Sequence, residues 1–417
     1  MVIGKAGCRG VLAITLVTGL LWASTPAAAQ QAPAPLPTGQ KGCLPPPVNT
    51  EPGVPWGQLR MAADRVWSLT KGAGVTVGVV DTGVDAGTPQ LSDGRVKPGL
   101  DVTVPERGTA NNDCYGHGTF VAGIIGASAV PGTGFAGVAP EATILPIRCA
   151  ITTTDGSPPV LTATEMAEGI RAAVDGGARV INISASTDTP DQRLADAVRY
   201  AAQRDVVVVA SAANSAQQGD PVTYPASYPT VIAVGAIDMT GKKADFSQTG
   251  RFLSLVAPGV GITSIGPGGG GHWVGSGTSY AAPFVAGVAA LVRAYRPHLS
   301  AEQVKHRLEA TADHPPAVLP DPQLGWGTVN AMAAVTTLLP EEAGGGGPVI
   351  AAEPAPIPVP ARPDGPGEVV AVAAAISVPV LALLALLVFR LGLGARRRRW
   401  KRARVVEFRA QSREIAA

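Results

Sequence analysis

The sequence predicts an α/β protein in which helices cover both faces of a mainly parallel sheet, a three-layer sandwich, followed by one C-terminal transmembrane helix. Two observations predict it. Short β-branched runs alternate with helical patterns through the middle of the 417-residue chain. Near the C-terminus, a long apolar run carries no charge. The composition, 46% hydrophobic and 15% charged, excludes a disordered chain.

Residues 1–29 have the pattern of a secretory signal peptide. Lys5 and Arg9 form a short positive region, Val11–Trp22 an apolar core, and Ala27–Ala29 supply the small residues that a cleavage site needs. We therefore expect the middle of the chain to be exported. An uncleaved signal would instead remain as a second anchor.

A Pro-rich, polar arm follows at residues 30–59, and it is too short to fold alone. From about Arg60 the composition becomes globular, which predicts one folded domain over residues 60–339. The expected strands are Val75–Val80, Ile144–Arg148, Val180–Ile183, Val206–Ala210 and Val231–Ala236. The expected helices are Thr164–Val174, Asp191–Gln203, Ser279–Tyr295 and a last one that a capping box opens at Ser300 and that runs to about Ala310.

The end of the chain is predicted to anchor the protein in a membrane. Residues 340–367 form a Pro/Gly-rich linker. The apolar run 369–389 is about 31 Å long as a helix, close to the hydrocarbon thickness of a bilayer. A buried core helix is the alternative, but core helices rarely run this long without a charge. The basic tail, residues 390–417, is expected in the cytoplasm and the folded domain outside, at the cell membrane.

The charge distribution argues against nucleic-acid binding. The whole chain carries a net charge of +2. The tail, residues 390–417, alone carries +8, so the rest of the chain carries −6. A nucleic-acid-binding protein spreads its positive charge over a folded face, whereas here it is confined to one tail.

Three segments contain residues suited to catalysis, and the first of them is Val77–Asp85. Asp81 follows an apolar run and precedes the turn residue Gly83. Open α/β sheets build their sites at the carboxyl ends of strands, which makes Asp81 a candidate functional carboxylate. An aspartate that only caps the following turn is the alternative.

The second segment centres on His117, which stands between Gly116 and Gly118 and starts a run of small and apolar residues. A helix built from such residues packs closely while its first turn presents the imidazole. A structural histidine is the alternative, and the flanking glycines argue against it.

The third segment is Gly275–Gly287, where Ser279 opens a helix that is apolar on nearly every side and must be buried. Backbone N–H groups and the dipole at a helix N-terminus favour negative charge. A nucleophile placed there can use its own N–H as an oxyanion donor. The alternative is that Ser279 or Thr278 serves only as an N-cap.

Together the three segments resemble the subtilisin-like serine peptidases over about residues 60–339, including the Asp–His–Ser order along the chain. The resemblance implies the subtilisin-like fold and serine endopeptidase activity on proteins or peptides, with no cofactor. In that reading Asp81 orients His117, His117 is the general base, and Ser279 is the nucleophile.

The resemblance also implies two further groups. Asn214 matches the asparagine that donates to the oxyanion, with a plain turn residue as the alternative. Ser184-Ala185-Ser186 matches the segment that forms the substrate edge, where the family usually has Ser-Leu-Gly. Further departures are Ala213 where the family usually has Gly, and Tyr280 and Phe284 where it usually has Met and His. All of these bear on the specificity pocket, so the residue preferred beside the cut stays open.

The whole-chain architecture resembles one subgroup, the mycosins of type VII secretion systems. The segment Asn112–Gly123 and the arm residue Cys43 match as well. The resemblance implies association with the membrane complex of such a system. It also leaves two alternatives to an active peptidase of this kind: a structural subunit with dispensable or latent activity, and a surface subtilase with no link to secretion.

Three cysteines remain once the signal peptide and its Cys8 are removed. An exported protein can hold disulfides. Cys43–Cys114 is the preferred pair, because it would staple the arm beside the loop of His117 and leave Cys149 free. Sequence alone does not fix this pairing.

Two short motifs do not point to other activities. Asp81-Thr82-Gly83 matches an aspartic-peptidase signature, but that mechanism needs a second carboxylate and the chain has no second such motif. Gly266–Gly271 matches a dinucleotide fingerprint by letters alone, without the strand and helix that should flank it, and is expected to be a surface loop. The remaining histidines show no metal-ligand spacing, so no metal site is predicted.

Overall fold

The computed structural model describes residues 32–37, 42–150, 161–342 and Arg390. The expected signal peptide, nearly all of the linker, the apolar run 369–389 and the tail beyond Arg390 lie outside the described residues. Among the residues that are described, no helix has the length and apolar character needed to cross a bilayer.

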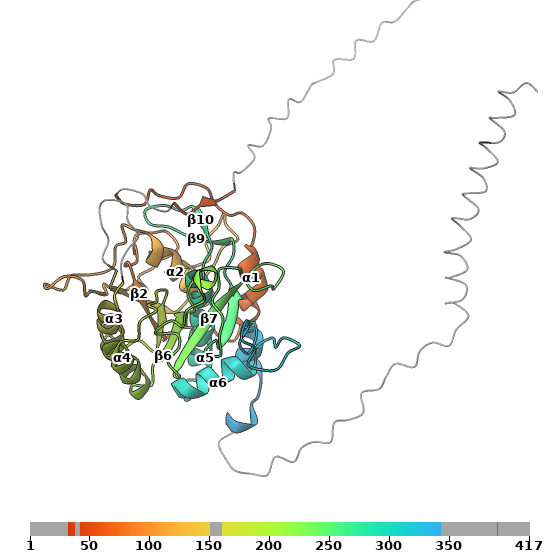
Figure 1. Cartoon of the computed structure of the whole chain (residues 1–417). Coiled ribbons are helices and arrows are strands. Elements are labelled where there is room, and N and C mark those ends of the chain that lie inside the picture. The colour runs from red at the N-terminus through yellow and green to blue at the C-terminus, as the bar shows by residue number, and fades with distance from the viewer. Residues whose placement is uncertain (1–31, 38–41, 151–160, 343–389, 391–417) are drawn as a thin grey trace, which may run out of the picture. The chain divides into compact units, whose positions relative to one another are not determined.

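A seven-stranded sheet forms the centre of the folded domain, and every neighbouring pair in it is parallel (Figure 1). Its order is β3 (Leu100–Asp101), β4 (Thr143–Arg148), β2 (Thr76–Asp81), β5 (Val180–Ile183), β6 (Val207–Ser211), β7 (Val231–Ile237) and β8 (Leu255–Pro258). All seven strands are short, and the five inner ones, β4, β2, β5, β6 and β7, are rich in β-branched residues, as in sheets that are buried on both faces.

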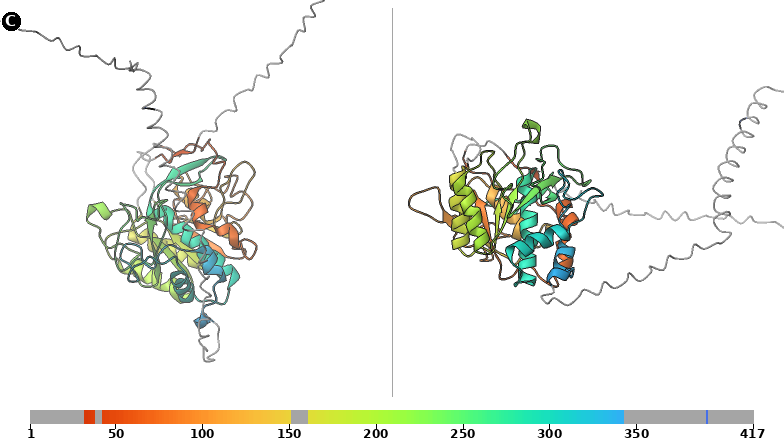
Figure 2. Two further views of the ribbon diagram at one scale, coloured as in Figure 1. Left: turned by 90° about the vertical axis from the view of Figure 1, so that its right-hand side faces the viewer. Right: turned by 60° about the horizontal axis from the view of Figure 1, so that its bottom comes forward.

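Helices cover both faces of this sheet, which confirms the predicted three layers (Figures 1 and 2). One face packs against α3 (Ala163–Asp175) and α4 (Gln192–Gln203). The other packs against α2 (His117–Gly126) and α5 (Thr278–Tyr295). Strand β5 shows the alternation: Val180 lies in the α2/α5 core, whereas Ile181 and Ile183 lie in the α3/α4 core.

The observed elements match the expected ones to within a residue or so at each end. Helix α5 begins one residue before the prediction, at Thr278. Helix α6 (Ala301–Ala310) begins with the predicted capping box, in which Ser300 and Gln303 each accept from the other's backbone N–H. Smaller helical elements complete the domain: α1 (Trp56–Met61), η1 (Ala63–Val66), η2 (Ala216–Gln218), α7 (Ala331–Thr336) and η3 (Pro340–Glu342).

A second, three-stranded sheet holds the start of the described chain. Strand β1 (Ala34–Pro35) pairs in parallel with β10 (His272–Gly275), which pairs antiparallel with β9 (Ile262–Ile265). The arm then runs over the Gly266–Gly271 loop, where Pro47 O accepts from Gly271 N at 3.2 Å. The glycine run is therefore the surface on which the arm lies.

The disulfide Cys43–Cys114 is present, which confirms the preferred pairing, and Cys149 is a buried free thiol. Next to the disulfide, Leu44 N donates to Cys114 O at 2.7 Å. The arm is thus fixed covalently three residues before His117.

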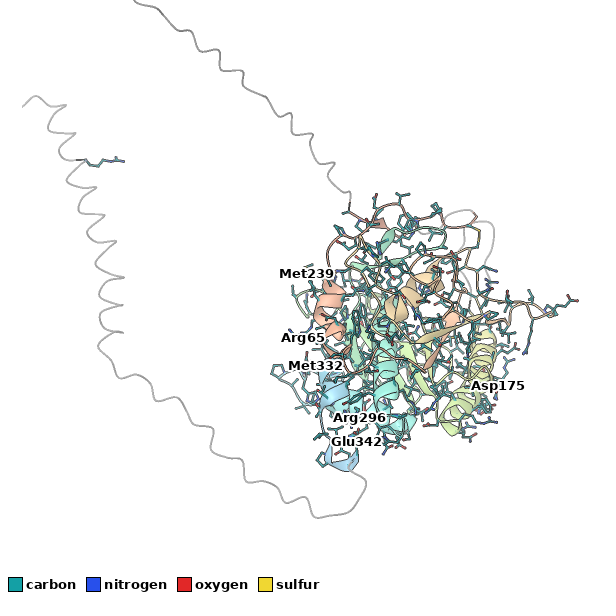
Figure 3. The ribbon with its side chains drawn as sticks, turned by 180° about the vertical axis from the view of Figure 1, so that it is seen from behind. Arg65, Asp175, Met239, Arg296, Met332 and Glu342 are labelled. Atoms are coloured by element: carbon teal, nitrogen blue, oxygen red, sulfur yellow. A yellow bond between two sulfur atoms is a disulfide. The ribbon has the colours of Figure 1, made fainter. Side chains whose placement is uncertain are left out.

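The last described residues of the folded domain are held by two guanidinium groups, one fully buried and one half-buried. Arg307, on α6, is fully buried, and its Nε donates to Glu342 at 2.6 Å. Arg296, at the end of α5, lies 3.8 Å from the same carboxylate, and Figure 3 labels Arg296 and Glu342 close together. These contacts pair the charge of Glu342, so its partly buried carboxylate is compensated.

Candidate functional site

The candidate site lies where strand ends meet helix N-termini. Asp81 is the last residue of β2, and Asn214 follows β6 after a short turn. His117 is the first residue of α2, and Ser279 is the second residue of α5. Both helices pack on the same face of the sheet. The sequence positions of these side chains are far apart, but the topology brings them to one edge.

Asp81 and His117 are in direct contact. His117 Nδ1 lies 2.8 Å from Asp81 Oδ1 and 3.0 Å from Oδ2, and the carboxylate is almost fully buried. Asp81 also accepts from Thr82 N at 2.8 Å. An aspartate that accepts from Nδ1–H leaves Nε2 as the basic nitrogen of the neutral imidazole.

Gly118 allows this close approach. A Cβ on residue 118 would lie 2.0 Å from Gly83 O and 3.2 Å from Asp81 Cβ. Only glycine therefore lets the first turn of α2 lie directly against the end of β2.

A second buried carboxylate organises the loop before His117. Asp113 accepts four hydrogen bonds, from Thr82 Oγ1, Gly116 N, Thr119 N and Thr119 Oγ1, all between 2.8 and 2.9 Å. Gly116, the N-cap residue of α2, has no side chain, so Asp113 supplies the acceptor that the helix N-terminus needs. Burial raises the pKa of Asp113, against the effect of these hydrogen bonds.

The electrostatic balance at His117 favours its charged form. Burial lowers its pKa, but the charge of Asp81, the hydrogen bond to Asp81 and the charge of Asp113 outweigh burial and raise it above the ordinary histidine value. The imidazole is thus a stronger base than a histidine in water.

Ser279 makes its hydrogen bond to the backbone after β5. Its Oγ donates to Ser184 O at 3.1 Å, and in the described part of the chain no hydrogen bond joins it to His117. The imidazole is nevertheless close to the start of α5, because its ring lies 5.5 Å from that of Tyr280. Unliganded sites often show long nucleophile–base contacts that shorten when substrate binds.

The Asn214 side chain is oriented by Thr278. Asn214 Oδ1 accepts from Thr278 N at 2.8 Å and from Thr278 Oγ1 at 2.9 Å. The same hydroxyl accepts from Ala213 N at 3.1 Å. With its oxygen held on one side, the amide can present Nδ2 as a donor on the other, and the exposed side chain leaves that donor accessible.

Ala213 adopts φ of +82°, in the left-handed region that favours glycine. Ala213 stands where the family usually has glycine, and at a steric cost it takes up the conformation that glycine adopts.

Ser184, Ala185 and Ser186 follow β5 directly, at the same sheet edge as Asp81. Ser184 is buried and contacts Ser279, whereas Ala185 and Ser186 are half-buried. Tyr280 and Phe284, the two helix positions where the sequence departs from the family, are buried, and Tyr280 packs against Phe120 with ring centroids 4.5 Å apart.

Three residues of the site were not predicted from the sequence: Asp113, Thr278 as the partner of Asn214, and Asn182, whose Nδ2 donates to Ser184 Oγ at 2.9 Å. Asn182 alone carried a visible signal, because it is the single polar residue in the buried strand Val180–Ile183. Asp113 and Thr278 act through partners that only the folded chain reveals.

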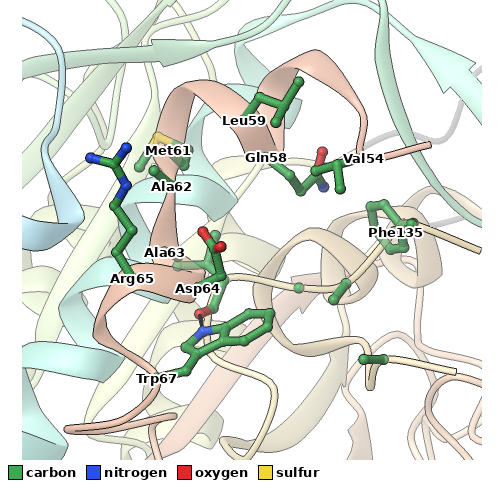
Figure 4. Close-up of a pocket in the computed structure, with 15 residues that line it drawn as sticks. Val54, Gln58, Leu59, Met61, Ala62, Ala63, Asp64, Arg65, Trp67 and Phe135 are labelled. Carbon is green, nitrogen blue, oxygen red and sulfur yellow. Dashed lines mark hydrogen bonds between the residues drawn. The ribbon is translucent and has the colours of Figure 1, made fainter.

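A cavity of about 410 Å³ lies apart from these groups. Figure 4 shows it between α1, η1 and the loop carrying Phe135, with Gln58, Leu59 and Trp67 among its lining residues. No member of the Asp81, His117 and Ser279 set lines it. Within the described ranges, no three His, Cys, Asp or Glu side chains gather as metal ligands do.

Known proteins resemble this geometry and sequence. The profile of the Subtilase family (Peptidase_S8) matches residues 72–327, more than half of the chain. Mycosin-4 of Mycobacterium tuberculosis (strain ATCC 25618 / H37Rv) is 38% identical over 353 residues, which cover 74% of this chain and 75% of that protein. Subtilisin DY of Bacillus licheniformis is 39% identical over 262 residues, 62% of this chain and 91% of that protein.

A solved structure described as the MycP3 protease from the type VII (ESX-3) secretion system shares the fold. It aligns with a TM-score of 0.62 and 35% identity, over 73% of this chain and 94% of that one. The seven-stranded parallel sheet is thus that of a subtilisin-like fold. The chain belongs to the subtilase family: it is a subtilisin-like serine endopeptidase related to the mycosins of type VII secretion.

Proposed function

We propose that this protein is a membrane-anchored endopeptidase that hydrolyses exported proteins or peptides with Asp81, His117 and Ser279 as its triad. The observation that carries the proposal is the hydrogen bond between Asp81 and His117 Nδ1 beside a serine at the N-terminus of a buried helix. Asp81 holds the imidazole with Nε2 free, and the raised pKa makes the neutral form of His117 a stronger base.

The chemistry then runs through an acyl-enzyme. As Ser279 Oγ bonds to the scissile carbonyl carbon, its proton moves to His117 Nε2. The resulting oxyanion accepts from Ser279 N–H and Asn214 Nδ2. Collapse breaks the C–N bond, the leaving amine takes the proton from His117, and water then hydrolyses the ester by the same route in reverse. Loss of a side-chain oxyanion donor costs about 10²–10³ in turnover.

The first test is covalent labelling by a fluorophosphonate, carried out on the detergent-solubilised full chain. We expect rapid labelling of the parent protein and none of Ser279→Ala, because the probe requires an activated serine. Asn214→Leu should slow labelling by the factor above at a temperature where the variant is fully folded, a condition that matters because Asn214 Oδ1 also accepts from Thr278. A folded parent protein that does not label would contradict the proposal.

The location and partner are proposed from other observations. The signal-like N-terminus, the uncharged run 369–389 and the basic tail support one membrane span with the folded domain outside the cytoplasm. Similarity to Mycosin-4 and to MycP3 from a type VII system supports association with such a complex.

Two experiments test this location and partner. Co-purification with a type VII membrane complex should persist in Ser279→Ala if binding does not need catalysis. Release of the chain from membranes by carbonate would contradict the span.

A further inference from the structure

The helix that carries Ser279 contains a break in its own hydrogen bonding. Pro283 lies inside α5, four residues after Ser279. In a regular helix the N–H of residue 283 would donate to the carbonyl of residue 279, but proline has no N–H and its ring crowds that carbonyl. Ser279 O therefore needs a donor from outside the helix.

Ser184 supplies that donor. Its Oγ donates to Ser279 O at 2.8 Å, while its own backbone oxygen accepts from Ser279 Oγ at 3.1 Å. One residue thus holds the backbone and the hydroxyl of Ser279 at the same time. Since the N–H of Ser279 belongs to the same short stretch of chain, fixing the carbonyl also limits where that N–H points.

Asn182 holds Ser184 in turn. Its Nδ2 donates to Ser184 Oγ at 2.9 Å, which leaves the hydroxyl proton for Ser279 O. Because side chains alternate along β5, Asn182 lies on the same face as Val180, whose side chain packs in the α2/α5 core. The chain Asn182–Ser184–Ser279 therefore crosses from the sheet to the first turn of α5.

Asn182 occupies this place at a cost. Its side chain is fully buried, and its Oδ1 has no hydrogen-bond partner among the described residues. An unpaired buried acceptor destabilises the fold, so stability alone favours an apolar residue here. A polar side chain that costs stability beside a reactive group is better explained by a role in the reaction.

We propose that Ser184 and Asn182 are positioning residues: their side chains replace the N–H missing at Pro283 and so fix the backbone of Ser279 at the first turn of α5. The inference rests on the proposed role of Ser279 as the nucleophile. It assigns to the Ser184 hydroxyl a function separate from the expected part of the 184–186 backbone in lining the substrate edge.

The test is a double-mutant cycle between Ser184→Ala and Pro283→Ala, with the rate of fluorophosphonate labelling and the melting temperature as its two readouts. Ser184→Ala in the parent chain should slow labelling roughly ten- to a hundred-fold at a temperature where it is fully folded. In the Pro283→Ala background, residue 283 supplies its own N–H to Ser279 O. There, Ser184→Ala should slow labelling no more than a few-fold, and it should lower the melting temperature by fewer degrees than it does in the parent chain. Ser184→Thr, which keeps the hydroxyl, should restore most of the rate.

Two further variants separate positioning from general packing. Asn182→Val should slow labelling several-fold with an unchanged or higher melting temperature. Thr311→Val is the matched control, because Thr311 Oγ1 also donates to a helix carbonyl, Arg307 O, at 2.7 Å. That carbonyl keeps a second donor, Thr311 N, so it is not left unpaired when the hydroxyl is removed. Its labelling rate should equal that of the parent.

The outcomes are distinct. An equal loss from Ser184→Ala in both backgrounds, or no loss in either, overturns the positioning role while leaving the proposed function intact. A folded parent protein that does not label overturns the proposed function, and the melting-temperature cycle then decides by itself whether Ser184 replaces the missing N–H.

Discussion

Two buried carboxylates, rather than one, govern the side chain of His117. Asp81 is its direct partner, and Asp113 reaches it through charge while holding the N-terminus of α2. Because the base must be neutral to accept a proton, activity is lost as pH falls through the raised pKa of His117. We therefore expect the acidic limb of kcat/KM to lie above the ordinary histidine pKa of about 6.5.

Asp113→Asn tests this balance. Removing the negative charge lowers the pKa of His117, so the acidic limb should move to lower pH by roughly half a unit. In the variant, the amide N–H₂ faces groups that donate to Asp113 in the parent protein, so donor meets donor. We expect this to cost about 1–3 kcal/mol of stability. The measurement is kcat/KM against pH at a temperature where both proteins are folded.

Asp175→Asn provides the control for a lost carboxylate. Asp175 ends α3, accepts from Tyr200 Oη at 2.6 Å and is labelled in Figure 3. It is not among the groups that shift His117. A limb that moves equally in both variants, or in neither, would contradict a specific role for Asp113.

For single residues, the sequence predicted which side chains carry the chemistry, but not which neighbours fix those side chains in position. Asp81, His117 and Ser279 stand in short motifs whose residue types match their role. The hydrogen bond between Thr278 and Asn214 joins residues 64 apart in sequence, and the one between Ser184 and Ser279 joins residues 95 apart. Only the strand order and register bring such pairs together, so no local pattern can reveal them.

Among the elements, β10 pairs with the arm and helps to join it to the domain. His272 at its start is almost fully buried between two fixed partners: Nδ1 accepts from Glu51 N at 3.1 Å, and Nε2 lies 3.0 Å from Gln90 Oε1. Burial lowers the pKa of His272 to about 4. Protonation at Nδ1 would remove the acceptor that Glu51 N–H uses.

The stability of the fold should therefore depend on pH through His272. In the unfolded chain a histidine takes up its proton below about pH 6.5, whereas the folded state resists until about pH 4. The contribution of His272 to stability is thus complete above the unfolded pKa. It falls by about 1.4 kcal/mol per pH unit as pH drops from 6.5 toward 4.

Urea denaturation at several pH values between 7 and 4.5 measures this loss. His272→Gln keeps a donor and an acceptor but cannot take up the proton, so its stability should fall less steeply over that range. Identical slopes for the two proteins would rule out His272 as the titrating group.

The elements that the sequence predicted were the long, regular ones. The five expected strands and the helices between them show clear β-branched or helical patterns. The outer strand β8 has four residues and ends in Pro258, and β3 has only two residues. Such strands form because a neighbour is already in place, and their own sequence carries almost no signal.

At the scale of the whole molecule, the arm closes a long loop onto the site. The disulfide joins residues 71 apart in sequence, and Cys114 lies between Asp113 and the turn that leads to His117. Leu44, the residue after Cys43, is buried, and its side chain would lie only 2.4 Å from a Cβ on Gly116. The arm is thus bonded to and packed against the loop that precedes His117.

Removing this cross-link should weaken both the fold and the site. A loop of this length implies about 4 kcal/mol of stabilisation through restriction of the unfolded chain, so Cys43→Ala with Cys114→Ala should lower the free energy of unfolding by about that amount. Urea denaturation measures this loss, and Cys149→Ala is the control for removing a buried sulfur outside the disulfide.

Because the freed loop carries Asp113, the double variant should also label more slowly at Ser279, even at temperatures well below its melting temperature. The acidic limb of its activity should move to lower pH, as in Asp113→Asn. If the double variant lost stability but kept its pH profile, the cross-link would stabilise the domain without positioning His117, and the loop with Asp113 would keep its place without the disulfide.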